Sequence, residues 1–372
     1  MRTVRRLLYV DVISAVVFVA LAFLSLFFFI DFVDELGDVG KNYSAMQAAL
    51  YSLLELPGHL YELSPIAVLI GTIYALSRLA QSSEFTILRT GGLGPGRALS
   101  LLMGLGVAFG VLTFVIGDYI APISERAAVE VRANARGVLG LGRSGAWLKD
   151  RSGTGEAERT YAITVQGTGS DGRLLNVRIY EFDPNGRLLQ RIFAETGKVG
   201  ADAVWTLDNA QVTDWSGASA DADPATLKVG MQRVASLRWQ STLAANVVSA
   251  AVLPENSMST FELRRYIAHL SGNEQTAQRF ELKFWKRALY PLACLVMVGL
   301  ALPFAYLHAR AGGVSLKVFG GIMLGISFVL MNNVAAHLGL LRNWTPWIVA
   351  ATPSLLYMLL SLAAFSWLVR YR

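Results

Sequence analysis

The sequence predicts an α-helical membrane protein with six transmembrane helices, three on each side of an inserted all-β domain. Hydrophobic residues make up 53% of the 372 residues and charged residues only 16%, whereas soluble globular proteins carry roughly 25% charged residues. The hydrophobic residues are concentrated in six long runs, and the segment between the third and fourth runs shows the alternation of short strands. These observations exclude a wholly soluble protein.

The first three hydrophobic runs lie in the first third of the chain. A bilayer core of about 30 Å requires roughly 20 apolar residues in a helix. Residues 12–30 form an uncharged run after three arginines, and because no small-residue cleavage site follows we interpret it as a retained span rather than a signal peptide. The second span extends from about Pro57 to Leu76 and includes Glu62. The third extends from Ala98 to Ile120.

Three further spans are predicted at Ala288–Leu307, Val318–Ala336 and Trp347–Val369. The positive-inside rule orients all six. With the N-terminus inside, the cytoplasmic segments hold ten basic residues: Arg2, Arg5, Arg6, Arg78, Arg89, Arg97, Arg310, Lys317, Arg370 and Arg372. The short outer loops hold only Lys41 and Arg342. We therefore expect both termini in the cytoplasm and the insert outside it.

The insert contains short alternating runs separated by turn signals. The predicted strands include Tyr161–Val165, Leu174–Tyr180 and Val204–Leu207. The predicted turns are Ser170–Gly172, Asp183–Gly186 and Thr196–Gly197. This pattern is typical of an antiparallel sandwich or roll.

A helix is predicted directly after the insert. Ser259 and Glu262 have the spacing of a capping box, which opens a helix that runs to about Leu270. A further helix from about Glu274 leads into the fourth span. The predicted organisation is therefore transmembrane helices 1–3 in residues 1–136, a β domain in 137–258, and a linker helix with transmembrane helices 4–6 in 259–372.

Familiar enzyme motifs are missing from the sequence. There is no P-loop, G-x-S-x-G or H-E-x-x-H motif, and Gly91–Gly96 has the wrong glycine spacing for a nucleotide site. A single cysteine, Cys294, excludes a disulfide framework, and the four histidines are far apart. We expect no cofactor, no metal and no nucleic-acid partner. The best enzymatic candidate is Asp118, but an aspartyl protease of the membrane needs a second aspartate, and Asp118 sits at the outer end of its span.

Charged residues cluster at the predicted outer surface. An acidic set at the end of span one has the i, i+3, i+4, i+7 spacing of one helical face: Asp31, Asp34, Glu35 and Asp38. It is either a solvated helix end or a polar seam that faces a partner or a water-filled cavity. Basic residues occur on the same side: Lys41, Arg126, Arg132, Arg136, Lys283, Lys286 and Arg287. They indicate either ordinary headgroup contacts or a site for an anionic lipid.

A short amphipathic segment, Ser82–Arg89, lies in the predicted cytoplasmic loop between spans two and three. Phe85 and Leu88 share one face, while Glu84 and Arg89 are expected to be exposed. The segment is either a surface turn or a docking helix for a cytoplasmic partner.

The whole chain resembles the lipopolysaccharide-export permease family, LptF/LptG, and is most similar to its LptG branch. The resemblance rests on Phe32–Asp38, Leu60–Pro65, Ser83 and Glu84 with Arg89 and Gly92, Pro122, and Phe280–Pro291. One departure is Thr90-Gly91, where relatives more often carry two alanines before the glycine.

The resemblance implies a transport subunit that is not itself an enzyme. It implies a bacterial inner-membrane permease with a periplasmic β-jellyroll, paired with a sister permease, LptF. It further implies an ABC transporter powered by a cytoplasmic ATPase dimer of the LptB type and joined to a single-span bridge protein of the LptC type. Ser83, Glu84, Arg89 and Gly92, in a coupling helix at about 82–92, would couple to the ATPase.

The resemblance also implies lipopolysaccharide as the substrate. Lys41, Arg132 and Arg136 would contact its phosphates, and we add Lys283, Lys286 and Arg287 to that set. Extracting a lipid costs about 0.8 kcal/mol per CH₂, so an apolar receptacle is needed. Inward-facing residues of the β domain, Ile163, Val165, Val177 and Ile179, either offer an open apolar surface or form an ordinary core. Two other functions stay open: a membrane enzyme for envelope lipid or peptide using Asp118, and a passive envelope scaffold.

Overall fold

The computed structural model describes most of the chain: residues 2–40, 43–82, 84, 94–136, 139–140, 146–153, 158–168, 173–200, 202–216, 228–243, 248, 258–272, 277–306 and 313–371. The chain forms two compact units. The helical unit comprises Met1–Asp34, Ser52–Ser124 and Gln278–Arg372. The sheet unit comprises Glu35–Tyr51 and Glu125–Ala277.

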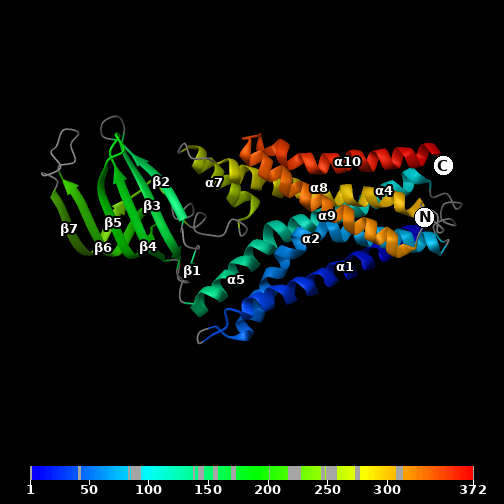
Figure 1. The fold of residues 1–372 in the computed structure, drawn as a ribbon, viewed down its shortest axis with the longest axis horizontal. Coiled ribbons are helices and arrows are strands. Elements are labelled where there is room, and N and C mark those ends of the chain that lie inside the picture. The colour runs from blue at the N-terminus through cyan, green and yellow to red at the C-terminus, as the bar shows by residue number, and fades with distance from the viewer. Residues whose placement is uncertain are drawn as a thin grey trace. The chain divides into compact units, whose positions relative to one another are not determined.

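Six helices of the described chain are long and apolar enough to span a membrane, which confirms the predicted number. The helices that contain them are α1 (Arg2–Leu36), α2 (Ala45–Gln81), α4 (Pro95–Val115) continued by the π-turn η1 (Ile116–Ile120) and α5 (Ala121–Arg136), α8 (Gln278–Tyr306), α9 (Val314–Leu341) and α10 (Pro346–Tyr371). The long helices run alongside one another (Figure 1). The α-helical membrane fold with an inserted β domain is confirmed.

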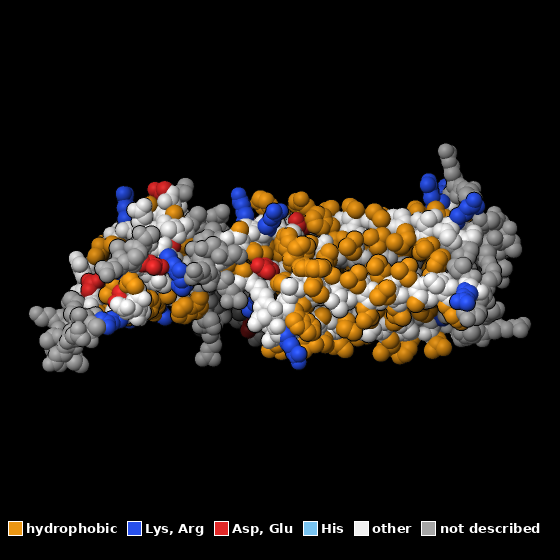
Figure 2. Space-filling model, turned by 90° about the horizontal axis from the view of Figure 1, so that it is seen from above, with side chains coloured by type: hydrophobic (Ala, Val, Ile, Leu, Met, Phe, Trp, Pro, Cys, Tyr) orange, Lys and Arg blue, Asp and Glu red, His pale blue; other side chains and the backbone are white. Residues whose placement is uncertain are grey.

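The surface of the helical unit is apolar, as a lipid environment requires. Figure 2 shows hydrophobic side chains over much of its visible face. Strongly exposed examples on α1 and α9 are Phe18, Leu21, Phe29, Leu316, Leu330 and Leu341. In water such a surface would promote aggregation, whereas in a bilayer the lipid acyl chains solvate it. The inside of the unit is a core formed by α1, α2, α4, α8, α9 and α10.

Helices α1 and α2 are joined by two polar contacts and one close approach. Arg78 donates to Asp11 at 2.9 Å, and His59 lies 2.7 Å from Asp31. The two aspartates are 20 residues apart on α1, which at 1.5 Å per residue is about 30 Å, the thickness of a bilayer core. Between them Gly71 faces Val16 so closely that a Cβ at Gly71 would lie 2.6 Å from the Val16 backbone.

The sheet unit holds one antiparallel sheet whose middle strands pair in chain order. Its strands are β1 (Leu139–Gly140), β2 (Ala146–Ser152), β3 (Arg159–Thr168), β4 (Leu174–Phe182), β5 (Leu188–Val199), β6 (Val204–Ser216) and β7 (Lys228–Gln240). β1 and β2 both pair with β3, and β3 to β7 follow in sequence. The three strands predicted from the alternating pattern are therefore confirmed in β3, β4 and β6.

The sheet is rolled, because residues far apart on a flat sheet are in contact. Following the register from Tyr161 on β3 across β4, β5 and β6 leads to Gly230 on β7, nine residues from Trp239. On a flat sheet nine residues alone correspond to about 30 Å. Yet the Tyr161 and Trp239 rings are 5.3 Å apart, centroid to centroid. Of the two predicted architectures, sandwich or roll, the described strands form the roll.

A buried carboxylate fastens this roll. Asp150 on β2 is 1% exposed. It accepts hydrogen bonds from the Ser241 hydroxyl at 2.6 Å and the Thr242 backbone amide at 2.9 Å, just after β7, as well as from the Arg151 amide. The Thr242 hydroxyl also donates to it. The contact joins the β2 edge of the sheet to the residues that follow the opposite edge strand. We call this contact the Asp150 clasp.

The interior of the roll is filled. Ile163, Val165, Val177 and Ile179 are fully buried around Trp205. Further buried residues of this core include Leu207, Leu243 and Val248. The idea that these four residues offer an open apolar surface is therefore wrong for this structure, in which they form the core of the roll.

The turn predictions had mixed outcomes. Asp183–Gly186 does form a turn, because the Asp183 carboxylate accepts the Asn185 and Arg187 amides and Gly186 adopts a positive φ of 78°. The turn predicted at Thr196–Gly197 is wrong, since both residues lie inside β5 and pair with β6. A Cβ at Gly197 would lie 2.9 Å from the Leu207 side chain, so glycine serves packing there. Residues 170–172 lie outside the described residues.

Helix α7 (Thr260–Gly272) follows the sheet. The predicted capping box is confirmed: Glu262 accepts the Ser259 amide at 2.8 Å, and Ser259 accepts the Glu262 amide at 3.3 Å. The helix predicted from about Glu274 begins at Gln278 in the described chain, while Glu274 itself lies outside the described residues.

Candidate functional site

The acidic face at the end of α1 is divided between different partners. Asp31 contacts His59, whose ring also packs on Phe27 with centroids 4.8 Å apart. Glu35 is buried and Asp38 is exposed, and both pair with Arg132 of α5. Asp34 is exposed and makes no polar contact with another described residue. Asp31 and Glu35 thus connect α1 to other helices, which is closer to the predicted polar seam than to a solvated helix end. The predicted helical face does not extend to Asp38, because α1 ends at Leu36 and Asp38 pairs with Arg132 from the turn that follows.

Arg132 is the centre of a charged network in the sheet unit. Its guanidinium lies 3.2 Å from a Glu35 oxygen and 3.4 Å from an Asp38 oxygen. It also lies over the Tyr51 ring at 5.3 Å. The second Glu35 oxygen accepts the Tyr43 hydroxyl at 2.9 Å. The expected phosphate ligand is therefore already paired with two carboxylates, and an incoming anion has to compete with them.

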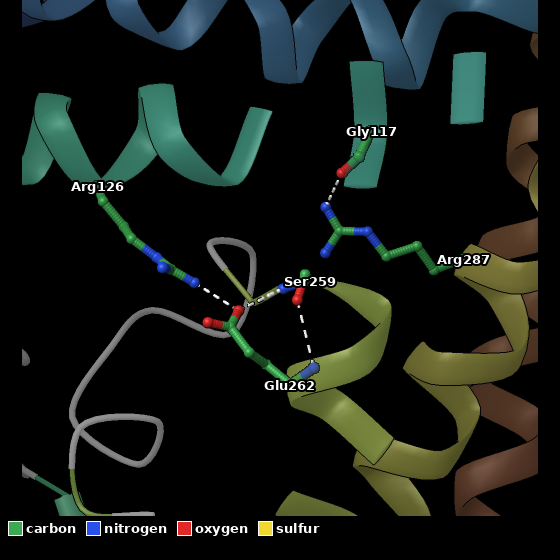
Figure 3. A network of polar contacts seen from close by, with 5 residues as sticks. All are labelled: Gly117, Arg126, Ser259, Glu262 and Arg287. Atoms are coloured by element: carbon green, nitrogen blue, oxygen red, sulfur yellow. Dashed lines mark hydrogen bonds and ion pairs between the residues drawn. The ribbon is translucent and has the colours of Figure 1, made fainter. Parts of the chain in front are cut away.

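Arg126 anchors the start of α7. Its guanidinium lies 2.5 Å from Glu262, the same carboxylate that accepts the Ser259 amide in the capping box (Figure 3). One side chain thus satisfies a helix N-terminus and an arginine together. This placement gives Arg126 a structural role within the sheet unit.

The basic residues of α8 lie in different environments. Lys283 and Lys286 are half-buried, and Lys286 makes no hydrogen bond or ion pair with a described residue. Arg287 is 8% exposed, and its guanidinium donates to the Gly117 carbonyl (Figure 3). The guanidinium also lies 5.7 Å from the centre of the Tyr61 ring. A phosphate contact by Arg287 would require its side chain to leave this position.

The π-turn η1 explains why Arg287 is held there. A π-turn disturbs the regular helical hydrogen bonding around it, and the Gly117 carbonyl accepts from Arg287. Gly117 is required because a Cβ there would lie 2.2 Å from the Tyr61 ring. The Tyr61 and Tyr290 rings are 4.8 Å apart, and the Tyr290 hydroxyl donates to the Glu62 carbonyl. α2, η1 and α8 therefore meet in a polar cluster inside the helical unit.

Sequence reasoning missed this cluster and the Asp150 clasp. The sequence signal for η1 is a glycine followed by an aspartate inside a hydrophobic run, Gly117 and Asp118. Sequence analysis considered Asp118 as a candidate site residue but assigned no role to Gly117. Asp118 is half-buried in η1. Among the described residues no group of three histidine, cysteine or acidic side chains could hold a metal ion.

The other predicted site residues lie mostly outside the described part of the chain. Ser83, Arg89, Gly92 and Lys41 lie outside the described residues. Arg136 belongs to α5, but its side chain lies outside the described part. Glu84 is helical and exposed, which agrees with the predicted exposure of its side chain.

Comparison with known proteins extends over nearly the whole chain. A model of the family described as "Lipopolysaccharide export system permease LptF/LptG" matches residues 6–368. The LptG protein of Escherichia coli K12 is 30% identical over 337 residues, which cover 90% of this chain and 89% of the relative. The LptG protein of Haemophilus influenzae is 27% identical over 336 residues, 89% of each chain. With six apolar helices and an inserted β sheet as well, the chain belongs to the lipopolysaccharide export permease family LptF/LptG.

Proposed function

We propose that this chain is the LptG-like permease subunit of an ABC transporter that extracts lipopolysaccharide from the outer leaflet of the inner membrane. It pairs with an LptF-type sister permease, a cytoplasmic LptB-type ATPase dimer and a single-span LptC-type bridge protein. The observation that carries the proposal is the family match over residues 6–368 together with six candidate spans. Both termini lie in the cytoplasm and the β domain in the periplasm, as the charge distribution favours.

Extracting a lipid from a bilayer requires an energy source outside this chain. Removing one ten-carbon acyl chain from a bilayer costs roughly 8 kcal/mol, at about 0.8 kcal/mol per CH₂. A lipid with several chains therefore needs nucleotide hydrolysis, and this sequence has no P-loop. The subunit itself is not an enzyme.

The phosphates of the lipid are held at the outer end of the helices by a basic set: Lys41, Arg132, Arg136, Lys283, Lys286 and Arg287. Arginine binds phosphate bidentately through charge-assisted hydrogen bonds. At Arg132 the phosphate displaces Glu35 and Asp38, both of which pair with the guanidinium in this structure. Lys286 needs no such exchange with a described residue.

This exchange is tested with Glu35→Gln. Because the variant removes the buried competing carboxylate, we expect half-maximal stimulation of ATPase activity at a lower lipopolysaccharide concentration in the reconstituted complex. Asp34→Asn is the matched control, since Asp34 lies one residue away and is exposed. An unchanged midpoint for Glu35→Gln, with Arg132→Gln also unchanged, would remove Arg132 from the phosphate site.

Coupling to the ATPase rests on the cytoplasmic segment with Ser83, Glu84, Arg89 and Gly92. Glu84 is exposed and negatively charged, which suits a docking contact. Glu84→Ala should leave the complex assembled but separate ATP hydrolysis from lipid release in proteoliposomes. Ser82→Ala, two residues away and exposed, should behave like wild type. Normal transport by Glu84→Ala would contradict the role of this residue.

We propose residues 1–136, 137–258 and 259–372 as the functional domains, with the β domain passing lipid towards the bridge protein. Since the apolar interior is filled in this structure, acyl chains can enter only if the roll opens. Photo-crosslinking from Val165 to lipopolysaccharide during ATP hydrolysis, compared with exposed Val229, tests this step. Labelling at neither position would restrict the lipid path to the membrane helices.

The two other functions have distinct signatures. A membrane enzyme using Asp118 would lose activity in Asp118→Asn without any change in assembly. A passive scaffold would co-purify without a P-loop protein. Affinity purification of the chain from its native membrane, followed by identification of a bound ATPase, separates both from the transporter.

A further inference from the structure

Helix α7 presents two different faces. Leu263, Tyr266 and Leu270 are buried. The exposed positions are Phe261, Arg264, Arg265 and Ala268, spaced i, i+3, i+4 and i+7. This spacing places them on one helical face. The face is therefore a continuous strip, not scattered surface residues.

The exposed strip combines an aromatic ring with positive charge. The Phe261 side chain is 64% exposed, although phenylalanine is among the residues most often buried in soluble proteins. The Arg265 guanidinium lies over its ring at 5.0 Å. Neither Arg264 nor Arg265 forms an ion pair with a residue in the described part of the chain.

The acidic residue of α7 does not neutralise the strip. Glu262 is engaged with the Ser259 amide and with Arg126, at 2.8 and 2.5 Å. The strip therefore carries two unneutralised guanidinium groups beside an exposed ring. That composition is typical of helices that lie in a membrane interface with anionic lipids.

Chain connectivity keeps α7 close to a membrane-spanning helix. Five residues separate its last residue, Gly272, from Gln278, where α8 and a candidate span begin. A link of five residues reaches at most about 18 Å. Gly272 is therefore held within about 18 Å of the start of α8, and the strip extends from there along α7 by at most 11 residues, about 17 Å.

We propose that the exposed strip of α7 lies on the headgroups of anionic phospholipids, with Phe261 inserted at the acyl boundary and Arg264 and Arg265 on lipid phosphates. The occupant is bulk phospholipid, so the inference goes beyond the proposed export function. It assigns α7 a membrane-anchoring role next to the β domain.

The test uses the full-length permease complex in nanodiscs of phosphatidylcholine with or without phosphatidylglycerol. A benzophenone amino acid replaces Phe261, and lipid adducts are detected by mass spectrometry after irradiation. We expect adducts with phospholipid that are strongest in the phosphatidylglycerol discs. Replacing both arginines by glutamine should lower their yield about tenfold or more.

Matched variants separate charge from folding. Arg264→Lys with Arg265→Lys keeps the charge and should restore most of the adduct. Val229, exposed on β7 of the same unit, should give little adduct. Equal yields at positions 229 and 261, or yields insensitive to phosphatidylglycerol and to the arginines, would overturn the proposal. So would adducts that form only with added lipopolysaccharide. Because no ATP is used, the result is independent of whether the chain exports lipid.

Discussion

Replacing Asp150 by alanine should open the roll of the β domain. The Asp150 carboxylate is buried and accepts four hydrogen bonds, two from backbone amides and two from hydroxyls. Two of the distances are 2.6 Å from Ser241 and 2.9 Å from the Thr242 amide.

The expected magnitude follows from these bonds. A hydrogen bond to a charged group contributes about 1.5–3 kcal/mol net, and a buried donor left unsatisfied costs about 1–3 kcal/mol. Since the contributions are not additive, we expect Asp150→Ala to destabilise the closed roll by about 3–4 kcal/mol. Each 1.4 kcal/mol is a factor of ten in an equilibrium constant, so opening should increase by two to three orders of magnitude. Asp150→Asn keeps the shape and part of the acceptor capacity, and should lose about half of that energy.

Hydrogen exchange followed by mass spectrometry on the full-length protein measures this opening directly. Amides of β2, β3 and β7 should exchange faster in Asp150→Ala, while the amides of α8 and α10 should not change. Asp202→Ala, a change of the same residue type at an exposed position, should alter exchange by less than about 0.5 kcal/mol. If protection of β2 and β7 were the same in Asp150→Ala and wild type, the clasp would not be what closes the roll.

Three further changes test other parts of the structure. Gly71→Ala places a Cβ 2.6 Å from the Val16 backbone and should lower the stability of the detergent-solubilised protein by about 1–3 kcal/mol, measured by thermal unfolding. Gly320→Ala, whose added Cβ meets only an ordinary contact, should have little effect. Equal losses in the two variants would refute a close crossing of α1 and α2. Burial, reinforced by the charge of Asp214, raises the pKa of Glu181 despite the neighbouring arginine. A raised carboxyl pKa stabilises the fold below the unfolded-state pKa, and this gain is lost as pH rises through the folded-state pKa. Acidification from pH 7 towards 5 should therefore protect the β strands from exchange more in wild type than in Glu181→Gln, and identical pH profiles would contradict this. Ser259→Ala removes one member of the capping box and should destabilise α7 by about 1 kcal/mol, read as faster exchange of its first amides, with no change expected if the cap were unimportant.

Local patterns in the sequence were enough to predict the elements. Spans are readable because a bilayer imposes a minimum apolar length on each helix. The capping box at Ser259 and the turn at Asp183 were equally readable, since a few neighbouring residues decide them. The same locality explains the error at Gly197: a glycine inside a strand reads as a turn unless the residue packed against it, Leu207, is known.

The candidate site was predictable in composition but not in pairing. The spacing of four carboxylates predicts one helical face, and the basic residues on the same side form a second unusual set. Whether Arg132 faces lipid or Glu35 depends on which helices lie side by side, and those residues are 97 positions apart. Burial of Arg287 against Gly117 similarly depends on a π-turn, which no local pattern specified.

The sequence by itself therefore determined the number of spans, their expected orientation, the strand content of the insert and the family. The tertiary structure alone decided that the sheet rolls up on a buried aspartate and that the apolar residues inside it form a core. It also decided which of the described charges at the helix ends pair with one another. The physical reason is the sequence separation of the interacting residues. Hydrophobic length and helix capping depend on residues within one element, whereas ion pairs and core packing join residues that only folding brings together.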